Sequence, residues 1–101
     1  MILADVMQIK IVYLGLIRNK IGKTEEQREL AEGSSLFDLF RVLISKYGEN
    51  LQSLIREGSE NWLDPTVIIT INGVLRDPSQ GDIVTLNDGD VVTIMTLISG
   101  G

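Results

Sequence analysis

Short segments in which apolar and polar residues alternate recur along the chain, and this period of two is typical of a β-strand with one buried face. The clearest is residues 7–14, Met-Gln-Ile-Lys-Ile-Val-Tyr-Leu. Residues 66–72 form a dense β-branched run, as in interior strands, and residues 91–97 form a final strand. Two weaker patterns lie at 25–32, which is charged and suits a sheet edge, and at 83–86. Together they predict a sheet of four or five strands.

One amphipathic helix is predicted between Ser35 and Gly48. Its apolar residues are spaced so that they share one stripe: Leu36, Leu39, Phe40, Leu43, Ile44 and Tyr47. The Ser35 hydroxyl can cap the free amides of the first turn, and Asp38 stands three residues on, where a reciprocal carboxylate belongs. Gly48 supplies the C-terminal stop. Such a helix can cover one face of the predicted sheet.

The remaining segments are less regular. Residues 15–23 carry two glycines and an asparagine and are predicted to be a link, and residues 77–82 a loop. Asn72-Gly73 and residues 87–90 predict tight turns. In residues 49–66 we expect a short second helix and a tryptophan that covers one end of the core.

The order of elements predicts the fold class. The predicted order is strand, weak strand, helix, strand, short strand, strand. This order indicates a two-layer α+β domain with a mixed sheet. The first and last strands are both strong and are expected side by side at the centre of the sheet, which is the β-grasp (ubiquitin-like) arrangement. We expect a loose arm at 1–6, or a true start at Met7, then the domain at 7–97 and a flexible tail at 98–101.

Composition narrows the function. The net charge of −5 and the isoelectric point near 4.5 argue against nucleic acid or a membrane as partner and suit a basic protein patch. Cysteine and histidine are absent, so thiol chemistry is excluded and neither a metal site nor a bound cofactor is expected. Neither a signal peptide nor an apolar run of membrane-spanning length is recognisable, which predicts a cytoplasmic protein.

The chain ends in Ser99-Gly100-Gly101, a candidate reactive tail. Without a Cβ to limit backbone approach, two terminal glycines form a thin thread that can enter a narrow enzyme channel. The α-carboxylate of Gly101 is the one reactive group there, and it is ionised at neutral pH given a reference pKa of about 3.3–3.7. The alternative is a frayed terminus without chemistry.

Apolar residues just before the tail are candidates for partner docking. Alternate positions of the last strand must face away from the helix, and Thr93, Met95, Leu97 and Ile98 would form an exposed strip there. Scattered surface apolar residues are the ordinary alternative. The chain has four lysines, and any of them could accept a modifier protein. Nothing in the sequence singles out one of them: Lys10, Lys20, Lys23 and Lys46.

Several pieces resemble a known family when taken in order. They are the first strand, the helix entry at 33–39, the Ile71-Asn72-Gly73 turn, and residues 86–92 leading to Gly101. This order resembles the ubiquitin-like sulfur carriers, which include MoaD of molybdopterin synthase, ThiS, the ubiquitin-related modifier and the archaeal small modifier proteins. Prolines common before the tail in the molybdopterin branch are absent here.

The resemblance implies a protein substrate rather than an enzyme. An E1-like activating enzyme would use ATP to adenylate the Gly101 carboxylate, and a sulfur donor would convert the adenylate to a thiocarboxylate for a sulfur acceptor enzyme. A target lysine could instead capture it as an isopeptide. The sequence leaves open which of these uses applies, the acceptor pathway and the oligomeric state. The alternative function is a β-grasp interaction module whose tail has no chemistry.

Overall fold

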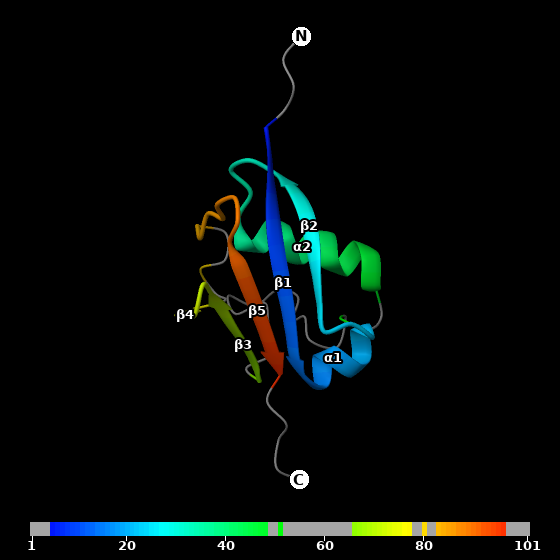
Figure 1. Cartoon of the computed structure of the whole chain (residues 1–101). Helices are drawn as coiled ribbons and strands as arrows, with labels where there is room; N and C mark the ends of the chain where they lie inside the picture. Colours follow the sequence, from blue (N-terminus) through cyan, green and yellow to red (C-terminus); the bar gives the residue numbers. More distant parts are fainter. Residues whose placement is uncertain (1–4, 49–50, 52–65, 78–79, 81–82, 97–101) are drawn as a thin grey trace.

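The computed structural model describes residues 5–48, 51, 66–77, 80 and 83–96. These residues form one mixed sheet with helical segments packed on it (Figure 1). The elements, in chain order, are β1 (Val6–Gly15), α1 (Leu16–Ile21), β2 (Glu25–Ala31), α2 (Leu36–Tyr47), β3 (Val67–Ile71), β4 (Val74–Arg76) and β5 (Val91–Thr96).

The strand order is β2-β1-β5-β3-β4, so β5 is the central strand. β1 and β5 run parallel, with Lys10 opposite Val91 and Gly15 opposite Thr96. All other neighbours are antiparallel. The prediction of an α+β β-grasp fold with its first and last strands side by side is therefore confirmed.

Helix α2 covers one face of the sheet and closes the core (Figure 1). The Ser35 hydroxyl accepts from the Asp38 amide at 3.1 Å, and the Asp38 carboxylate accepts from the Ser35 amide at 2.9 Å, which confirms the capping box. The Gly48 amide donates to the Ile44 carbonyl at the other end. Each buried leucine in the helix stripe contributes about 1.5–3 kcal/mol by leaving water. The inward side chains of β1, β3 and β5 supply the opposite half of the core, including Ile9, Ile11, Tyr13, Ile69, Val92 and Ile94.

The predicted link at 15–23 contains a helix, α1, which the sequence analysis missed. Gly22 adopts a left-handed conformation and its amide donates to the Arg18 carbonyl, which ends the helix. Ile17 is buried and Ile21, four residues on, packs against the same core. This spacing was the available signal, but two glycines so close together favoured a turn.

The predicted strand at 83–86 was wrong, and the fourth strand is β4 instead. Residues 84–86 run beside the start of α2 and form only one isolated bridge, between Ser35 and Thr85. β4 follows directly from the predicted turn, because Asn72 and Gly73 both have positive φ, as a tight hairpin turn requires. β4 has only three residues, all of them exposed, so the sequence there shows no alternation of buried and exposed positions that would predict a strand.

The expected second helix and tryptophan cover in 49–66 fall almost wholly outside the described residues, although Leu51 is buried in the core. Within the described parts of the chain, no helix is long and apolar enough to cross a membrane.

Candidate functional site

The last strand is held firmly where it leaves the sheet. Thr96, its final residue, is 6% exposed and lies between Gly15 of β1 and Val67 of β3. The Thr96 hydroxyl accepts a hydrogen bond of 2.9 Å from the Ile17 amide. This bond satisfies an amide in the first turn of α1, where a helix has no backbone partner of its own. Whatever follows Thr96 therefore starts from a fixed point at the end of the central strand.

Gly15 is the reason that the strand end and α1 can approach so closely. A Cβ at this position would lie 2.3 Å from the Thr96 carbonyl oxygen, which is far inside van der Waals contact. The backbone of Gly15 also has a φ of 76°, a region that other residues avoid. The glycine thus serves both the turn from β1 into α1 and the anchoring of β5.

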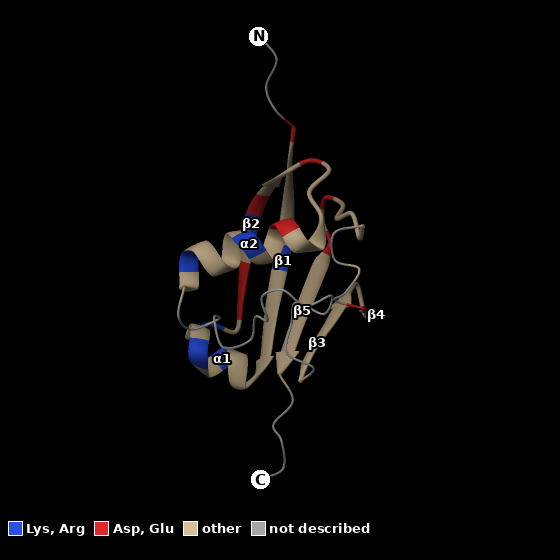
Figure 2. Cartoon of the chain, turned by 180° about the vertical axis from the view of Figure 1, so that it is seen from behind, with Lys and Arg blue, Asp and Glu red and all other residues tan. Residues whose placement is uncertain are grey.

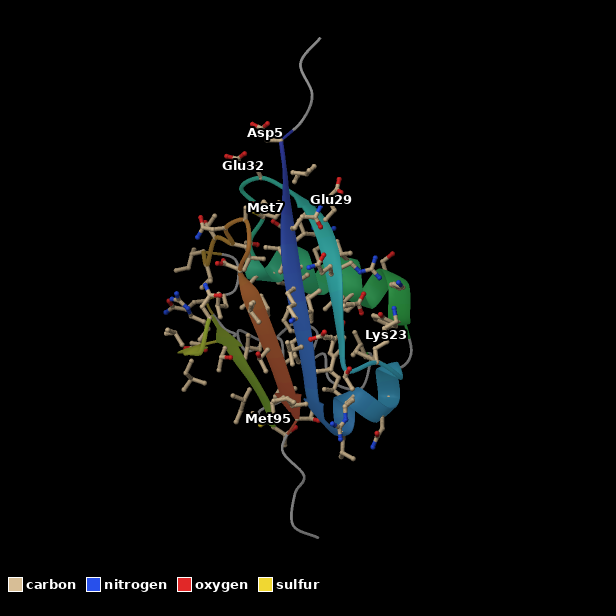
Figure 3. All side chains as sticks on the ribbon, viewed as in Figure 1. Asp5, Met7, Lys23, Glu29, Glu32 and Met95 are labelled. Atoms are coloured by element: carbon tan, nitrogen blue, oxygen red, sulfur yellow. The ribbon has the colours of Figure 1, made fainter. Side chains whose placement is uncertain are left out.

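The predicted tail, Ser99, Gly100 and Gly101, lies outside the described residues, as do Leu97 and Ile98. Thr93 and Met95 are described, and both are half-buried on the sheet face that α2 does not cover. Figure 3 labels Met95 near the end of β5. The structure thus places the two described members of the predicted docking set on one face, and the prediction of a docking role remains a prediction.

Thr93 and Met95 lie in an apolar strip built from three strands. The register puts Val12 and Thr70 on either side of Thr93, and Leu14 and Ile68 on either side of Met95. We call these residues the sheet strip: Val12, Leu14, Ile68, Thr70, Thr93 and Met95. Leu14 is 38% exposed, and Leu75 of β4, opposite Thr70, is 70% exposed and extends the apolar surface. Only the paired register brings these residues together, since no local run contains them.

Acidic residues border the sheet strip on its β2 side. Lys10 of β1 pairs with Glu25 at 3.1 Å, and the Gln8 amide group donates to Glu29 at 3.2 Å. Both carboxylates belong to the exposed face of β2. The open face therefore combines an apolar centre with an acidic border, which complements an apolar and basic partner surface.

The aspartates of the 87–90 segment are turn residues, as predicted. The Asp88 carboxylate accepts from the Gln8 amide at 2.7 Å, which ties the turn to β1. Asp90 is buried and accepts from the Asn87 amide and from the Asn72 side chain, both at 2.8 Å. Both carboxylates thus accept hydrogen bonds from other residues of the domain, which assigns Asp88 and Asp90 a structural role in this turn.

A polar cluster under α2 was not found from the sequence. Tyr13 of β1 and Tyr47 of α2 both donate hydrogen bonds to the Glu26 carboxylate of β2, and Arg28 pairs with it at 2.8 Å. Burial opposes ionisation of Glu26, but the two tyrosine hydroxyls and the Arg28 charge outweigh it and hold the Glu26 pKa below 4.5. Burial and the Glu26 charge raise the pKa of Tyr13 well above its usual value. The cluster ties three elements together but lies under the helix, on the opposite side from the sheet strip.

No group of three or more potential metal-ligating side chains comes together among the described residues. The candidate functional site is the anchored end of β5 together with the sheet strip beside it.

Comparison with known protein families gives a match that covers most of the chain. The model described as the ThiS family matches residues 11–101, from the middle of β1 through to Gly101. The chain belongs to the ThiS family. The match includes the whole of β5 and the terminal glycines, so the family pattern covers the part of the chain on which the tail prediction depends. No curated protein matches the chain significantly.

Solved structures show the same fold. Small archaeal modifier protein 1 from Methanosarcina acetivorans is 24% identical, with a TM-score of 0.74 over 96% of this chain and 99% of that one. A putative molybdopterin converting factor subunit 1 from Pyrococcus furiosus is 27% identical, with a TM-score of 0.69 over 91% of this chain and 99% of that one. A chain of the BexX/CysO complex of Amycolatopsis orientalis is 19% identical, with a TM-score of 0.68 over 92% and 99%. These neighbours, together with the family match, identify a ubiquitin-like sulfur carrier family.

Proposed function

We propose that this ThiS-family protein is a carrier whose Gly101 carboxylate is adenylated by a separate E1-like enzyme. The observation that supports this most is the family match through Gly101, combined with a strand end pinned immediately before the tail. Thr96 fixes the point from which the tail starts, and the tail ends in two glycines. An enzyme that binds the folded domain could therefore reach the Gly101 carboxylate. The chain itself then acts as a substrate and binds no cofactor, and the activating enzyme uses the ATP.

The chemistry proceeds by activation of the carboxylate. An oxygen of the Gly101 carboxylate attacks the α-phosphate of ATP and expels pyrophosphate, which leaves a mixed anhydride between the glycine and AMP. A hydrosulfide-level sulfur donor can then attack the acyl carbon; the bond from that carbon to the phosphate oxygen breaks, AMP leaves with its electron pair, and the thiocarboxylate remains for a sulfur acceptor enzyme. A lysine amine can displace AMP instead and form an isopeptide. Both uses need the same free carboxylate.

The sheet strip is the surface we assign to partner docking, with Leu97 and Ile98 continuing the set. Its apolar residues surround the end of β5, so a partner seated there would be close to the origin of the tail. The structurally similar chain from Amycolatopsis orientalis was solved in the BexX/CysO complex, which supports the proposal that this chain also binds a partner. The acidic border would orient a basic partner and raise the rate of encounter.

The decisive experiment alters only the end of the chain. We expect that deleting Gly101, or adding one residue after it, abolishes adenylation by the cognate enzyme, measured as ATP–pyrophosphate exchange. The circular dichroism spectrum and melting temperature should be unchanged. Normal exchange with either variant would contradict the proposal and favour an interaction module.

The two uses of the activated tail are separated by mass. Protein recovered from its native host should show the mass gain of one sulfur replacing one oxygen if it is a sulfur carrier. Lysine-linked adducts on other proteins would show conjugation.

A further inference from the structure

The outer edge of β2 is open in the part of the chain that the structure describes. β2 is the first strand in the order β2-β1-β5-β3-β4, and its one neighbour among the described strands is β1 (Figure 1). The Tyr13 amide donates to the Thr24 carbonyl in the antiparallel register of this pair. Because hydrogen-bonded pairs alternate along such a ladder, the backbone groups of Glu25, Gln27 and Glu29 point outward. The edge therefore offers backbone donors and acceptors to a further strand.

A depression of about 570 Å³ lies where this edge strand meets α2. Its lining consists of one residue of β2 and five of α2: Arg28, Asp38, Arg41, Val42, Ser45 and Lys46. The Asp38 carboxylate is engaged in the cap of α2, so the lining presents mainly positive charge. Figure 2 shows this side, with the blue bands of α2 near β2. The net charge of the chain is −5, so this cationic surface is opposite in sign to the protein as a whole.

A further cation stands at the end of the depression that is nearest the C-terminus of α2. The ammonium nitrogens of Lys23 and Lys46 lie 5.9 and 5.6 Å from the centroid of the Tyr47 ring. The Tyr47 hydroxyl donates to Glu26, which fixes the ring between α2 and β2. Figure 3 labels Lys23 beside the end of α2. Lys23 comes just before β2, so the edge of that strand begins beside two ammonium groups.

Arg28 has a donor that no described residue uses. Its Nε pairs with Glu26 at 2.8 Å, whereas its Nη2 is buried and has no hydrogen-bond partner among the described residues. The Glu26 carboxylate also accepts from Tyr13 and Tyr47, so its lone pairs are largely occupied. A buried donor without an acceptor is unfavourable. A carboxylate that entered the depression from outside would supply an acceptor to the Arg28 guanidinium.

The two faces of the β2 edge carry opposite charge. The side chains of Glu25, Gln27 and Glu29 are exposed on the open face of the sheet, and the cationic depression lies on the face of α2. A strand added to this edge would point its side chains alternately to the two faces. It fits only with carboxylates at every second position, toward the depression, and with neutral or basic side chains between them.

We propose that the β2 edge and the adjoining depression bind an extended acidic peptide of a partner protein, which adds to the sheet as a further strand. Backbone hydrogen bonds to Gln27 and Glu29 would contribute affinity, and carboxylates facing Arg28, Arg41 and Lys46 would set the specificity. Successive carboxylates on one face of a strand are about 6.8 Å apart, so they can reach different cations of the depression. The sheet strip is on the other face, so both surfaces can be occupied together. The proposal does not depend on activation of the tail.

The first test uses full-length protein and a dye-labelled synthetic peptide of about eight residues, in which Glu alternates with Thr. The control peptide has the same composition with all Glu residues contiguous, so half of its carboxylates point away from the depression. We expect saturable binding of the alternating peptide in fluorescence anisotropy at physiological salt, and about tenfold weaker binding of the control. Equal affinities would show attraction by net charge alone. That result, or no binding of either peptide, would overturn the proposal.

The second test reverses one charge in the depression. Arg41→Glu should weaken binding of the alternating peptide at least about tenfold, because one cation is replaced by a repelling anion. Arg76→Glu makes the same change on β4, at the opposite edge of the sheet, and should stay within about twofold of the native affinity. Both residues are exposed, and melting temperatures show whether the variants are folded. Equal losses in the two variants would refute the site.

The third test examines the backbone of the edge. Gln27→Pro removes an outward amide and leaves the ladder to β1 intact, since proline is tolerated where the missing N–H faces solvent. The folded variant should lose peptide binding. Amide hydrogen exchange followed by NMR gives a second measurement on the native protein, in which the amides of Gln27 and Glu29 should become protected when the peptide binds. Peptide binding without this protection would show that no strand is added to β2, whether or not Gln27→Pro folds.

Discussion

Gly15 shows how one residue can control the geometry of the C-terminal strand. Its missing side chain lets the Thr96 carbonyl approach, and its positive φ turns the chain from β1 into α1. From the sequence, Gly15 was recognisable only as a turn former. Its close approach to Thr96, far along the chain, became visible only with β1 and β5 paired.

Replacing Gly15 by alanine should destabilise the fold more than the same change at Gly22. Both glycines have positive φ, so each substitution costs about 1–2 kcal/mol in backbone strain. Gly22 has open space for a Cβ, whereas at Gly15 the clash with Thr96 should add about 1–3 kcal/mol. Urea unfolding followed by circular dichroism measures both. Equal losses in the two variants would show that the approach to Thr96 is not a constraint.

Secondary-structure elements meet at two places that matter here, the polar cluster under α2 and the sheet strip. The ends of α2 were readable from Ser35, Asp38 and Gly48, because capping is a local interaction. The cluster was not, because Tyr13, Glu26 and Tyr47 belong to three elements and become neighbours only through packing. Glu26 also lay on a charged strand where a solvated role was the simplest interpretation.

The cluster should make stability depend on pH in the acid range. The pKa of Glu26 is held below 4.5 in the folded protein, so its stabilising effect is complete above 4.5 and is lost as the pH falls through the lower folded value. Glu26→Gln should cost about 1.5–3 kcal/mol at neutral pH, since the tyrosines lose a charged acceptor. The difference from the native protein should shrink below pH 4.5. Glu25→Gln, on the exposed face of β2, is the control and should change the free energy of unfolding little. A loss of stability in Glu26→Gln that does not vary with pH would show that Glu26 is not ionised and stabilising in the folded protein.

The sheet strip should respond to charge at its centre. Met95→Glu places a carboxylate among apolar neighbours and is expected to raise the KM of the activating enzyme for this protein about tenfold, the equivalent of about 1.4 kcal/mol of binding. Ser45→Glu adds the same charge to the exposed side of α2, on the other side of the sheet from the strip, and should leave KM unchanged. Melting temperatures show whether each variant is folded. A folded Met95→Glu protein with native KM would exclude the strip as the docking surface.

At the scale of the whole molecule, the start of β1 and the end of β5 lie at opposite ends of the sheet. Because β1 and β5 run parallel, Val6 at the start of β1 lies at the opposite end of the sheet from Thr96 at the end of β5 (Figure 1). The N-terminal end of the sheet is thus far from the point where the tail begins. This separation follows from the β-grasp topology and from no single residue.

A fusion at the N-terminus should therefore be tolerated. We expect a short peptide tag before Met1 to leave ATP–pyrophosphate exchange by the cognate enzyme within about twofold of the native rate, since a surface change away from an interface has little effect on binding. The same tag after Gly101 should abolish exchange. If the N-terminal tag also abolished it while the protein remained folded, the partner would have to contact both ends of the sheet.

The sequence by itself determined the buried faces of the main strands, helix α2 with both of its ends, the hairpin turn at Asn72-Gly73 and the β-grasp class. These depend on periodicity, capping and turn conformations, which act between residues close together in the chain. Tertiary structure decided that residues 16–21 are helical, that β4 rather than 83–86 completes the sheet, and that Tyr13, Glu26 and Tyr47 form one polar cluster. Those outcomes depend on contacts between distant segments, whose strength is set by register and packing and so cannot be read along the chain.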